Sequence, residues 1–429
     1  MMYYFIGIKG SGMSALAIIL KQLGYQVSGS DIPKHFFTET GLIENNIPIY
    51  EYNEENIKPD MIIIKGASIK EDNIELIKAR NLNLEILEYN EMVGKLTREF
   101  KTICIAGCHG KTTTTNMLSV ALKTRGTSYL IGDGTGYGNK QSKYFALEAC
   151  EYQRHFLAYL PYYAIITNID LDHVDYFKDI NDVIDAYTSY ANNATKKIIA
   201  YGDDPYTRQM KVTKPIIFYG LEEGNDITAT NVNYHSKGIS FDIGGYGHFD
   251  LPLYGQHQLL DALAVITVCR EENIPYEEAQ ANLMDFKGAK RRFTETLVQD
   301  NVIIDDYAHH PNEVKATIDA VKQKYPDKSL VIIFQPHTFS RTKEFADDLT
   351  AVFKNADATY LLDIHPAREK QEDYPGVTSN MIIDKLPNAY HLNLDEASKL
   401  ANYHNTVFAF MSPNDISKLE NDLQKLLKG

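Results

Sequence analysis

Glycines, a lysine and a run of threonines gather in one stretch of the chain, Lys101 to Thr115. An apolar run ends at Ala106, Gly107 and Gly110 follow, and Lys111 opens the threonine-rich part. Glycines permit a tight turn whose backbone N–H groups, at the start of a helix, suit a polyphosphate. The lysine then reaches the terminal phosphates and the next hydroxyl reaches Mg²⁺. The spacing Gly-x-x-Gly-Lys-Thr, shorter than the standard loop, therefore predicts phosphate binding; the alternative is a plain strand–helix turn.

Acidic residues and a histidine follow two later apolar runs. Glu148 comes directly after residues 144–147, and His173 lies just beyond residues 164–168. The ends of neighbouring strands in one sheet lie close together, so these side chains are expected to lie near the phosphate loop. Mg²⁺ prefers hard oxygen ligands, and a phosphate loop needs protein groups that hold its metal. The pattern predicts a metal site beside the phosphate loop, with carboxylates from Glu148, Asp170 or Asp172 and with His173 either a ligand or one shell away. The alternative is a set of solvated loop charges.

A second glycine turn opens the chain. The apolar run from Tyr3 is followed by glycines at positions 7, 10 and 12, a helical segment, and a second strand that ends at Asp31. This order of strand, glycine turn, helix, strand and acid is typical of a Rossmann-type diphosphate site. The pattern G-x-x-G-x-G favours a nucleotide diphosphate other than a dinucleotide, while NAD and a merely structural turn stay open. The candidate ligand residues are Gly10, Ser11, Gly12, Met13, Ser30, Asp31 and Ser68.

Polar side chains recur in the second half of the chain. His257, Gln258 and Asp261 have helical spacing and are predicted to face a nucleotide base, and Lys290 to Phe293 forms a basic cluster suited to phosphate or to solvent. In the last third, strand ends are predicted to carry a polar ligand-binding set: Asp305, His309, His337 and Arg341.

Alternation of strands and helices predicts an α/β protein of three domains, residues 1–98, 99–295 and 296–429. The first and last are expected to be Rossmann-like. The central one is expected to be P-loop ATPase-like with added antiparallel β-structure, from the alternating pattern of residues 228–253. The glycine-dense residues 131–138 are predicted to form a loop that passes close to a ligand.

The 429 residues carry a net charge of −14, which argues against a broad nucleic-acid surface. The four cysteines lack metal-knuckle spacing, and no apolar run is long enough to span a bilayer. A cytoplasmic protein without a membrane partner, monomeric or weakly dimeric, is expected.

Several motifs together resemble the Mur ligases. They occur in the family's order along nearly the whole chain: Gly7-Ile8-Lys9-Gly10-Ser11-Gly12-Met13, Gly107-Cys108-His109-Gly110-Lys111-Thr112-Thr113, Glu148-Ala149-Cys150-Glu151-Tyr152, Thr167-Asn168-Ile169-Asp170, Lys290-Arg291-Arg292-Phe293, Asp305-Asp306-Tyr307-Ala308-His309-His310-Pro311 and Gln335-Pro336-His337-Thr338-Phe339-Ser340-Arg341. The resemblance implies an ATP-dependent ligase that joins L-alanine to the carboxylate of UDP-N-acetylmuramate through an acyl phosphate, in peptidoglycan precursor synthesis.

The resemblance also implies residue roles. ATP would contact Gly107, Cys108, His109, Gly110, Lys111, Thr112, Thr113, His257, Gln258, Asp261, Arg292 and Asp305, and Mg²⁺ would be held by Thr112, Glu148 and His173. Catalytic roles fall to Lys111, Glu148, His173, His309 and Arg341, the last pair at positions that hold alanine.

The chain departs from the family pattern at three places. Gln258 and Asp261 stand where asparagines are usual, and Ser412 to Asp415 replaces Gly-Ala-Gly-Asp. Cys108 replaces a threonine. The favoured interpretation is a small residue that merely fits; the alternative is that this thiol, at a helix N-terminus beside Lys111, has a lowered pKa and is oxidisable.

Rival functions remain at this point. A nicotinamide-dependent dehydrogenase would use the N-terminal glycine turn, and a nucleotide-switch module would use only the phosphate loop. A sister ligase would attach a preformed peptide to the same sugar. The polar set of the last third favours a ligase over the switch.

Overall fold

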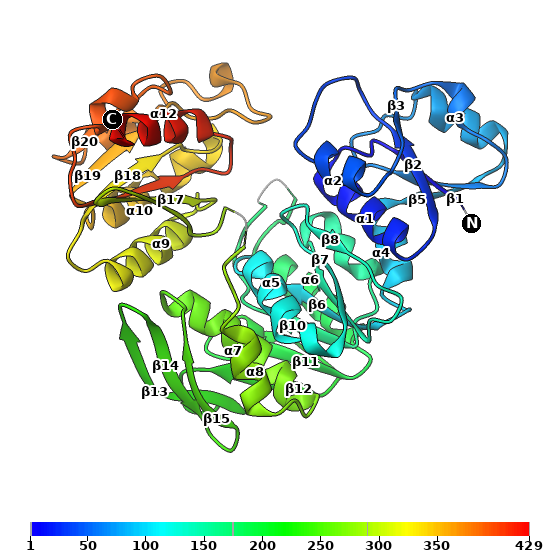
Figure 1. The fold of residues 1–429 in the computed structure, drawn as a ribbon, viewed down its shortest axis with the longest axis horizontal. Coiled ribbons are helices and arrows are strands. Elements are labelled where there is room, and N and C mark those ends of the chain that lie inside the picture. Colours follow the sequence, from blue (N-terminus) through cyan, green and yellow to red (C-terminus); the bar gives the residue numbers. More distant parts are fainter. Residues whose placement is uncertain (1, 174–175, 290, 429) are drawn as a thin grey trace. The chain divides into compact units, whose positions relative to one another are not determined.

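The computed structural model describes residues 2–173, 176–289 and 291–428, and the chain divides into two compact units. The first comprises Met1–Asn231, Phe241–Phe249 and Leu260–Phe286. The second comprises Val232–Ser240, Asp250–Leu259 and Lys287–Gly429. In the described residues the strands form three sheets, each with helices packed on it (Figure 1).

The N-terminal sheet is parallel and has the order β3-β2-β1-β4-β5. Its elements are β1 Met2–Ile6, α1 Ser11–Gln22, β2 Gln26–Ser30, α2 Glu39–Glu44, β3 Ile49–Tyr50, β4 Met61–Lys65, α3 Ile74–Asn81, β5 Glu85–Glu88 and α4 Tyr89–Leu96. Apolar residues of α1 and α4 pack on one face of the sheet and those of α3 on the other. Because β2 and β4 flank β1, the chain reverses its direction across the sheet at β1. Such a switch point leaves a crevice at the strand C-termini.

The central sheet has the order β15-β14-β13-β12-β11-β10-β6-β9-β7-β8. Its strands are β6 Lys101–Ala106, β7 Thr127–Leu130, β8 Gly136–Tyr137, β9 Tyr144–Glu148, β10 Tyr163–Ile166, β11 Lys197–Tyr201, β12 Ile216–Gly220, β13 Ile227–His235, β14 Gly238–Ile243 and β15 Gly247–Leu251. The helices are α5 Lys111–Ala121, α6 Ile180–Asn192, α7 Gln256–Glu271 and α8 Tyr276–Leu283. Strand β6 lies between β9 and β10 with parallel pairing, so the ends of these strands share one edge.

The glycine-dense residues 131–138, predicted to form a loop, contain a short strand. Gly136–Tyr137 form β8, which pairs antiparallel with β7. A Cβ atom on Gly136 would lie 2.5 Å from the carbonyl oxygen of Ala15, and one on Gly138 would lie 2.6 Å from that of Ile19. The glycines are therefore required for close packing on α1, a tertiary reason that the local sequence does not reveal.

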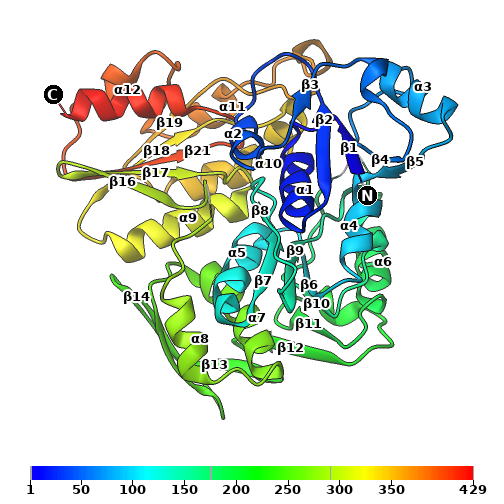
Figure 2. The ribbon, with the colours of Figure 1, turned by 45° about the vertical axis from the view of Figure 1, so that its right-hand side comes forward.

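The C-terminal sheet has the order β16-β17-β21-β18-β19-β20, with β16 antiparallel to β17 and the others parallel. Its elements are β16 Thr294–Val298, β17 Asn301–Asp306, α9 Pro311–Lys324, β18 Ser329–Phe334, α10 Phe339–Phe353, β19 Ala358–Leu361, α11 Asn380–Ile383, β20 Ala389–His391, β21 Thr406–Met411 and α12 Ser417–Lys428. Apolar residues of α9 and α10 cover one face and those of α12 the other. Figure 2 shows this layering from a second direction.

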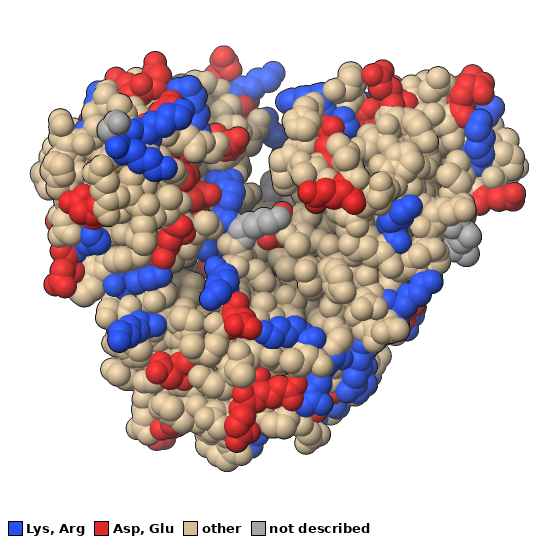
Figure 3. Space-filling view, in the orientation of Figure 1, with Lys and Arg blue, Asp and Glu red and all other residues tan. Residues whose placement is uncertain are grey.

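Basic and acidic side chains are interspersed on the face of the surface drawn in Figure 3. Among the helices that the structure describes, none is both long and apolar enough to cross a membrane.

Candidate active site

The predicted phosphate loop joins β6 to α5. Gly107 and Gly110 have φ of +148° and +83°, values that L side chains rarely adopt. A Cβ on Gly107 would clash with the hydroxyl of Thr167, and one on Gly110 would lie 2.5 Å from Oδ1 of Asp261. Both glycines are thus required by conformation and by close contacts, and they place Lys111 at the first position of α5.

Lys111 is held by an acid that the sequence analysis gave no role. Its ammonium, 15% exposed, lies 3.0 Å from a carboxylate oxygen of Glu151, which is 3% exposed. It also donates a hydrogen bond to the carbonyl of Gly107. Burial works to raise the pKa of Glu151, but the charges of Lys111 and His173 lower that pKa overall. Glu151 therefore keeps the ammonium charged and oriented across the loop.

His173 joins the same cluster. Its Nε2 lies 3.4 Å from Glu151, and the ring packs against Tyr152. Burial works to lower the pKa of His173, and the hydrogen bond with Glu151 raises it overall. In this structure His173 therefore partners an acid.

Hard oxygen donors are present beside Lys111. Glu148 ends β9, its carboxylate accepts a hydrogen bond of 2.7 Å from the N–H of Gly132, and its charge is among those that raise the pKa of Lys111. Thr112 is half-buried in the first turn of α5. Across the described residues no three His, Cys, Asp or Glu side chains converge as a metal cage. A hydroxyl and one carboxylate nonetheless fit Mg²⁺, which keeps several waters and takes other oxygens from phosphates.

The alternative of a lowered pKa at Cys108 is wrong. Burial raises the pKa of this thiol to about 12, with Glu151 adding to the effect. The sulfur lies 3.1 Å from both the carbonyl oxygen and the N–H of Asp170. Next to it, the N–H of His109 donates a hydrogen bond of 2.9 Å to Asn168. Cys108 therefore acts as a small, satisfied packing residue.

The residues predicted to face a base are engaged inside the fold. Gln258 is 8% exposed and accepts a hydrogen bond from the N–H of Tyr254 at 3.0 Å. Asp261 is 5% exposed and accepts one from the hydroxyl of Thr114 at 2.8 Å, which braces the first turns of α5. Burial lowers the pKa of His257 to about 4, so its ring is neutral at pH 7.

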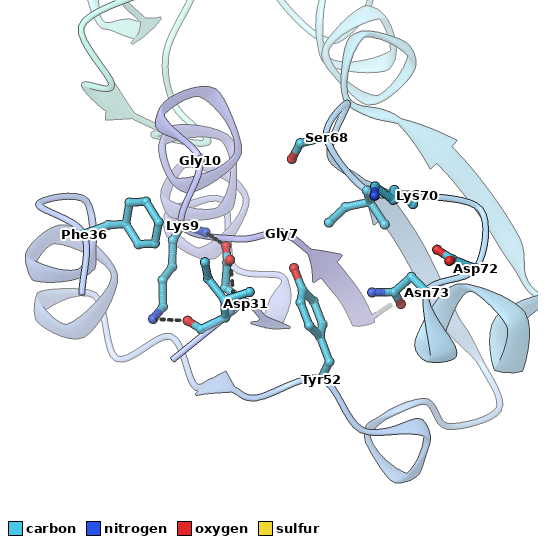
Figure 4. Close-up of a pocket in the computed structure, with 12 residues that line it drawn as sticks. Gly7, Lys9, Gly10, Asp31, Phe36, Tyr52, Ser68, Lys70, Asp72 and Asn73 are labelled. Carbon is cyan, nitrogen blue, oxygen red and sulfur yellow. Dashed lines mark hydrogen bonds between the residues drawn. The ribbon is translucent and has the colours of Figure 1, made fainter. Parts of the chain in front are cut away.

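The N-terminal sheet carries a pocket of about 450 Å³ at the ends of β1, β2 and β4 (Figure 4). It is lined by Gly7, Lys9, Gly10, Asp31, Ile32, Phe36, Tyr52, Ser68, Ile69, Lys70, Asp72 and Asn73. Of the predicted ligand residues, the structure brings Gly10, Asp31 and Ser68 to this pocket.

The remaining predicted residues of the glycine turn lie elsewhere. Ser30 is fully buried and donates its hydroxyl hydrogen bond to Glu75. Met13 is 6% exposed and packs in the core, and Gly12 lies against the ring of Tyr89. Ser11 begins α1 and lies against Gly134.

In the second unit the structure gathers His309, His337 and Arg341. The rings of His309 and His337 are 5.9 Å apart, and Arg341 lies 3.2 Å from Nδ1 of His337. Burial lowers the pKa of His309, and burial together with His309 lowers that of His337 to about 4. Glu313, which the sequence analysis missed, lies 3.3 Å from Nδ1 of His309 and 3.6 Å from Arg292.

Asp305 pairs with a neighbour of the basic cluster. Its carboxylate lies 3.2 Å from Arg291, whose guanidinium also donates to carbonyls of residues 412–414. Through these contacts Arg291 holds residues 412–414, part of the segment that differs from the family pattern, beside β17. Lys290, part of the predicted basic cluster, lies outside the described residues.

Comparison with known proteins matches all three segments of the chain to family models. Residues 2–101 match "Mur ligase family, catalytic domain", residues 105–269 match "Mur ligase middle domain", and residues 291–415 match "Mur ligase, glutamate ligase domain". The predicted α/β architecture of three domains is confirmed by these matches and by the three sheets.

Relatives with full-length similarity are found among curated sequences and solved structures. The chain is 46% identical over 433 residues to the UDP-N-acetylmuramate–L-alanine ligase of Lactiplantibacillus plantarum, covering 99% of each chain. It is similar to the crystal structure of the UDP-N-acetylmuramate–alanine ligase of Thermotoga maritima, with a TM-score of 0.82, 25% identity and 99% of each chain covered. A MurF ligase of the same organism in complex with ADP shares the fold, with a TM-score of 0.65, 18% identity, and 94% and 95% coverage.

Proposed function

The chain belongs to the Mur ligase family, and from that premise we propose that it joins L-alanine to UDP-N-acetylmuramate with ATP as the energy source. The observation that carries the proposal is 46% identity to a ligase of this specificity over 99% of both chains. This identity confirms the sequence-based prediction of an acid–amino-acid ligase in peptidoglycan synthesis. ATP dependence follows from family membership.

We assign the three substrates to the three sheets. Residues 1–98 bind the UDP-sugar, residues 99–295 bind ATP, and residues 296–429 bind the amino acid. The pocket that contains Asp31 and Ser68 supports the first assignment, the glycine loop before Lys111 the second, and the His309–His337–Arg341 group the third.

Phosphoryl transfer to the sugar carboxylate brings two anions together. The Lys111 ammonium, already held beside Glu151, stabilises charge on the γ-phosphate, and the N-terminus of α5 adds backbone donors. Mg²⁺, when bound at Thr112 and Glu148, supplies further charge neutralisation of the phosphates. We place His173 behind Glu151 as a partner that orients the carboxylate.

The acyl phosphate is then attacked by the free amine of alanine, with release of phosphate and formation of the amide. Arg341 is suited to the alanine carboxylate because a guanidinium binds carboxylates with directed hydrogen bonds. His309, neutral at pH 7, is suited to accept a hydrogen bond from the ammonium or amine. Water must be excluded during this step, or the acyl phosphate hydrolyses. A cytoplasmic location and a monomer or weak dimer are proposed alongside.

The proposal is tested with the full chain, UDP-N-acetylmuramate, ATP, Mg²⁺ and one candidate amine at a time. We expect ADP release only with both sugar and L-alanine present, and a product whose mass equals the amide. An amide formed only with a preformed peptide would favour the sister ligase. Reduction of a nicotinamide cofactor would favour the dehydrogenase, and ADP release without amide would favour a switch.

A further inference from the structure

Lys9 is a buried lysine inside the N-terminal glycine turn. Its side chain is 7% exposed, although the residue lines the sugar-nucleotide pocket. Figure 4 shows the side chain running beside the ring of Phe36, with a hydrogen bond at its end. Its position in the motif Gly7 to Met13 did not indicate what its side chain contacts.

The ammonium of Lys9 is fully used by protein acceptors. It donates hydrogen bonds of 2.9 Å to the carbonyls of Ile32 and Lys34. It also lies 3.1 Å from Oε1 of Glu39. Three acceptors match the three donors of an ammonium group, so in this structure the charge of Lys9 is directed at the protein segment that supplies them.

The backbone of Lys9 binds the same segment, residues 31–39, which we call the pocket wall. The N–H of Lys9 donates to Oδ2 of Asp31 at 2.8 Å, and its carbonyl accepts from the hydroxyl of Thr38 at 2.6 Å. Five contacts therefore tie one residue of the glycine turn to both ends and the middle of the wall.

The N–H of Asp31 also bonds to Tyr50, and Glu39 begins α2, but the wall between these two ends has little other support. Residues 32–38 contain no regular element, and Phe37 is 73% exposed. Within the wall, the N–H of Phe36 donates to Glu39 at 2.8 Å, and this hydrogen bond is the largest cause of the lowered pKa of Glu39. Without Lys9 the wall would lose its main connection to the glycine turn.

We infer that Lys9 is a positioning residue that fixes the pocket wall, so that Asp31 and Phe36 are preformed for the nucleoside part of the sugar nucleotide. The inference rests on the proposed function for the identity of the ligand. A carboxylate suits ribose hydroxyls and aromatic rings suit a flat base, and both groups stand on or beside the wall. Direct contact between Lys9 and the diphosphate is the competing interpretation.

The two interpretations differ in which ligands lose affinity. We would titrate UDP and uridine into the full-length wild type and Lys9→Met by calorimetry or NMR. If Lys9 fixes the wall, both ligands lose affinity by the same factor, at least about 10-fold, because only the fraction of molecules with the wall in place can bind either of them. A loss confined to UDP would show a direct phosphate contact, and unchanged affinities would show no role; either result overturns the inference.

Lys34→Met is the matched control. It removes the same charge from the wall itself, but the Lys34 ammonium only lies over the Phe36 ring at 5.7 Å and makes no ion pair with a described residue. We expect its affinities to stay within about 2-fold of wild type. Binding of ADP to Lys9→Met, also within 2-fold, would show that the ATP domain remains folded.

A measurement without ligand separates the inference from the proposed function. Trypsin cleaves after Lys34 when the wall opens, so Lys9→Met should be cut there several-fold faster than wild type, and saturating UDP should slow the cut. Glu39→Gln weakens one of the contacts, so its rate of cleavage after Lys34 should lie between those of wild type and Lys9→Met. Equal cleavage of wild type and Lys9→Met would overturn the inference. A wild type that binds neither UDP nor uridine would instead overturn the sugar-nucleotide site itself.

Discussion

Two lysines beside glycine turns differ in the segments that hold them. The ammonium of Lys111 donates to the carbonyls of Gly107 and Cys108 within its own loop and pairs with Glu151. The ammonium of Lys9 donates to carbonyls and an acid of the pocket wall, which lies 23–30 residues further along the chain. Lys111 is therefore held at the predicted phosphate loop itself, whereas Lys9 connects its glycine turn to another segment.

Lys111→Ala is expected to reduce ligation by at least about 10²–10³-fold, since it removes a preorganised charge from the transferring phosphate. ADP release at saturating substrates measures the effect. Lys123→Ala is the control, because Lys123 pairs with Asp285 on the surface. Near-normal turnover of Lys111→Ala would refute the assignment of the loop.

His309→Ala is expected to raise the KM for alanine about 10-fold or more while the KM for ATP changes little. The reason is the loss of one hydrogen bond to a charged substrate, about 1.5–3 kcal/mol. His391→Ala, a surface histidine paired with Asp363, should leave both constants unchanged. Equal increases in both KM values for His309→Ala would count against an alanine-binding role.

At the scale of elements, β8 and α1 are packed backbone to backbone through glycines. Gly136 has no unusual φ, so alanine is permitted there by conformation, and only the carbonyl of Ala15 stands in the way. The N-terminal and central sheets are thereby joined within one compact unit.

Gly136→Ala is expected to destabilise that unit by about 1–3 kcal/mol, the usual cost of overpacking. Urea unfolding followed by circular dichroism measures it. Gly244→Ala is the matched control, because a Cβ there would meet nothing within 4 Å. Equal urea midpoints for the two variants would show that the close contact between Gly136 and Ala15 does not require glycine.

At the scale of the whole molecule, acidic residues outnumber basic ones, and one acid with a buried side chain forms ion pairs with several lysines. Glu272, with its side chain 4% exposed, lies 2.9 Å from Lys196 and 3.3 Å from Lys101, and it accepts hydrogen bonds from Tyr144 and Tyr163. Burial works to raise its pKa, but the hydrogen bonds lower it to about 2. These partners lie at or beside the N-terminal ends of β6, β9, β10 and β11, so Glu272 connects the four strands at that edge of the central sheet.

Because the folded pKa of Glu272 is below the unfolded value of 4.5, its stabilisation is complete above about pH 4.5 and is lost as the pH falls toward 2. Glu272→Gln is expected to cost about 1.5–3 kcal/mol at pH 7, in line with hydrogen bonds to charged groups. The difference in unfolding free energy from wild type should narrow between pH 5 and pH 3. A difference that is constant over this range would show that the charge of Glu272 is not what stabilises the sheet.

Much of the architecture was predictable because it follows from the local spacing of apolar residues, glycines and charged residues. Strand β6, the glycine turn and helix α5 follow from an apolar run, two glycines and a lysine within a few residues. The alternation of strands and helices in the last third likewise predicted the C-terminal sheet. Local patterns did not reveal the raised pKa of Cys108 or strand β8 within the glycine-dense residues 131–138, because the surroundings of both come from distant parts of the chain.

The sequence by itself determined which chemistry the chain carries: a phosphate loop, carboxylates at strand ends, and a histidine–arginine set in the family's order. Only the tertiary structure decided the partners. It paired Lys111 with Glu151, 40 residues away, raised the pKa of Cys108 by burial, and directed the ammonium of Lys9 to the pocket wall. The physical reason is that a side chain's charge and hydrogen bonds depend on how closely remote segments pack around it. Residue types and local spacing do not contain that packing.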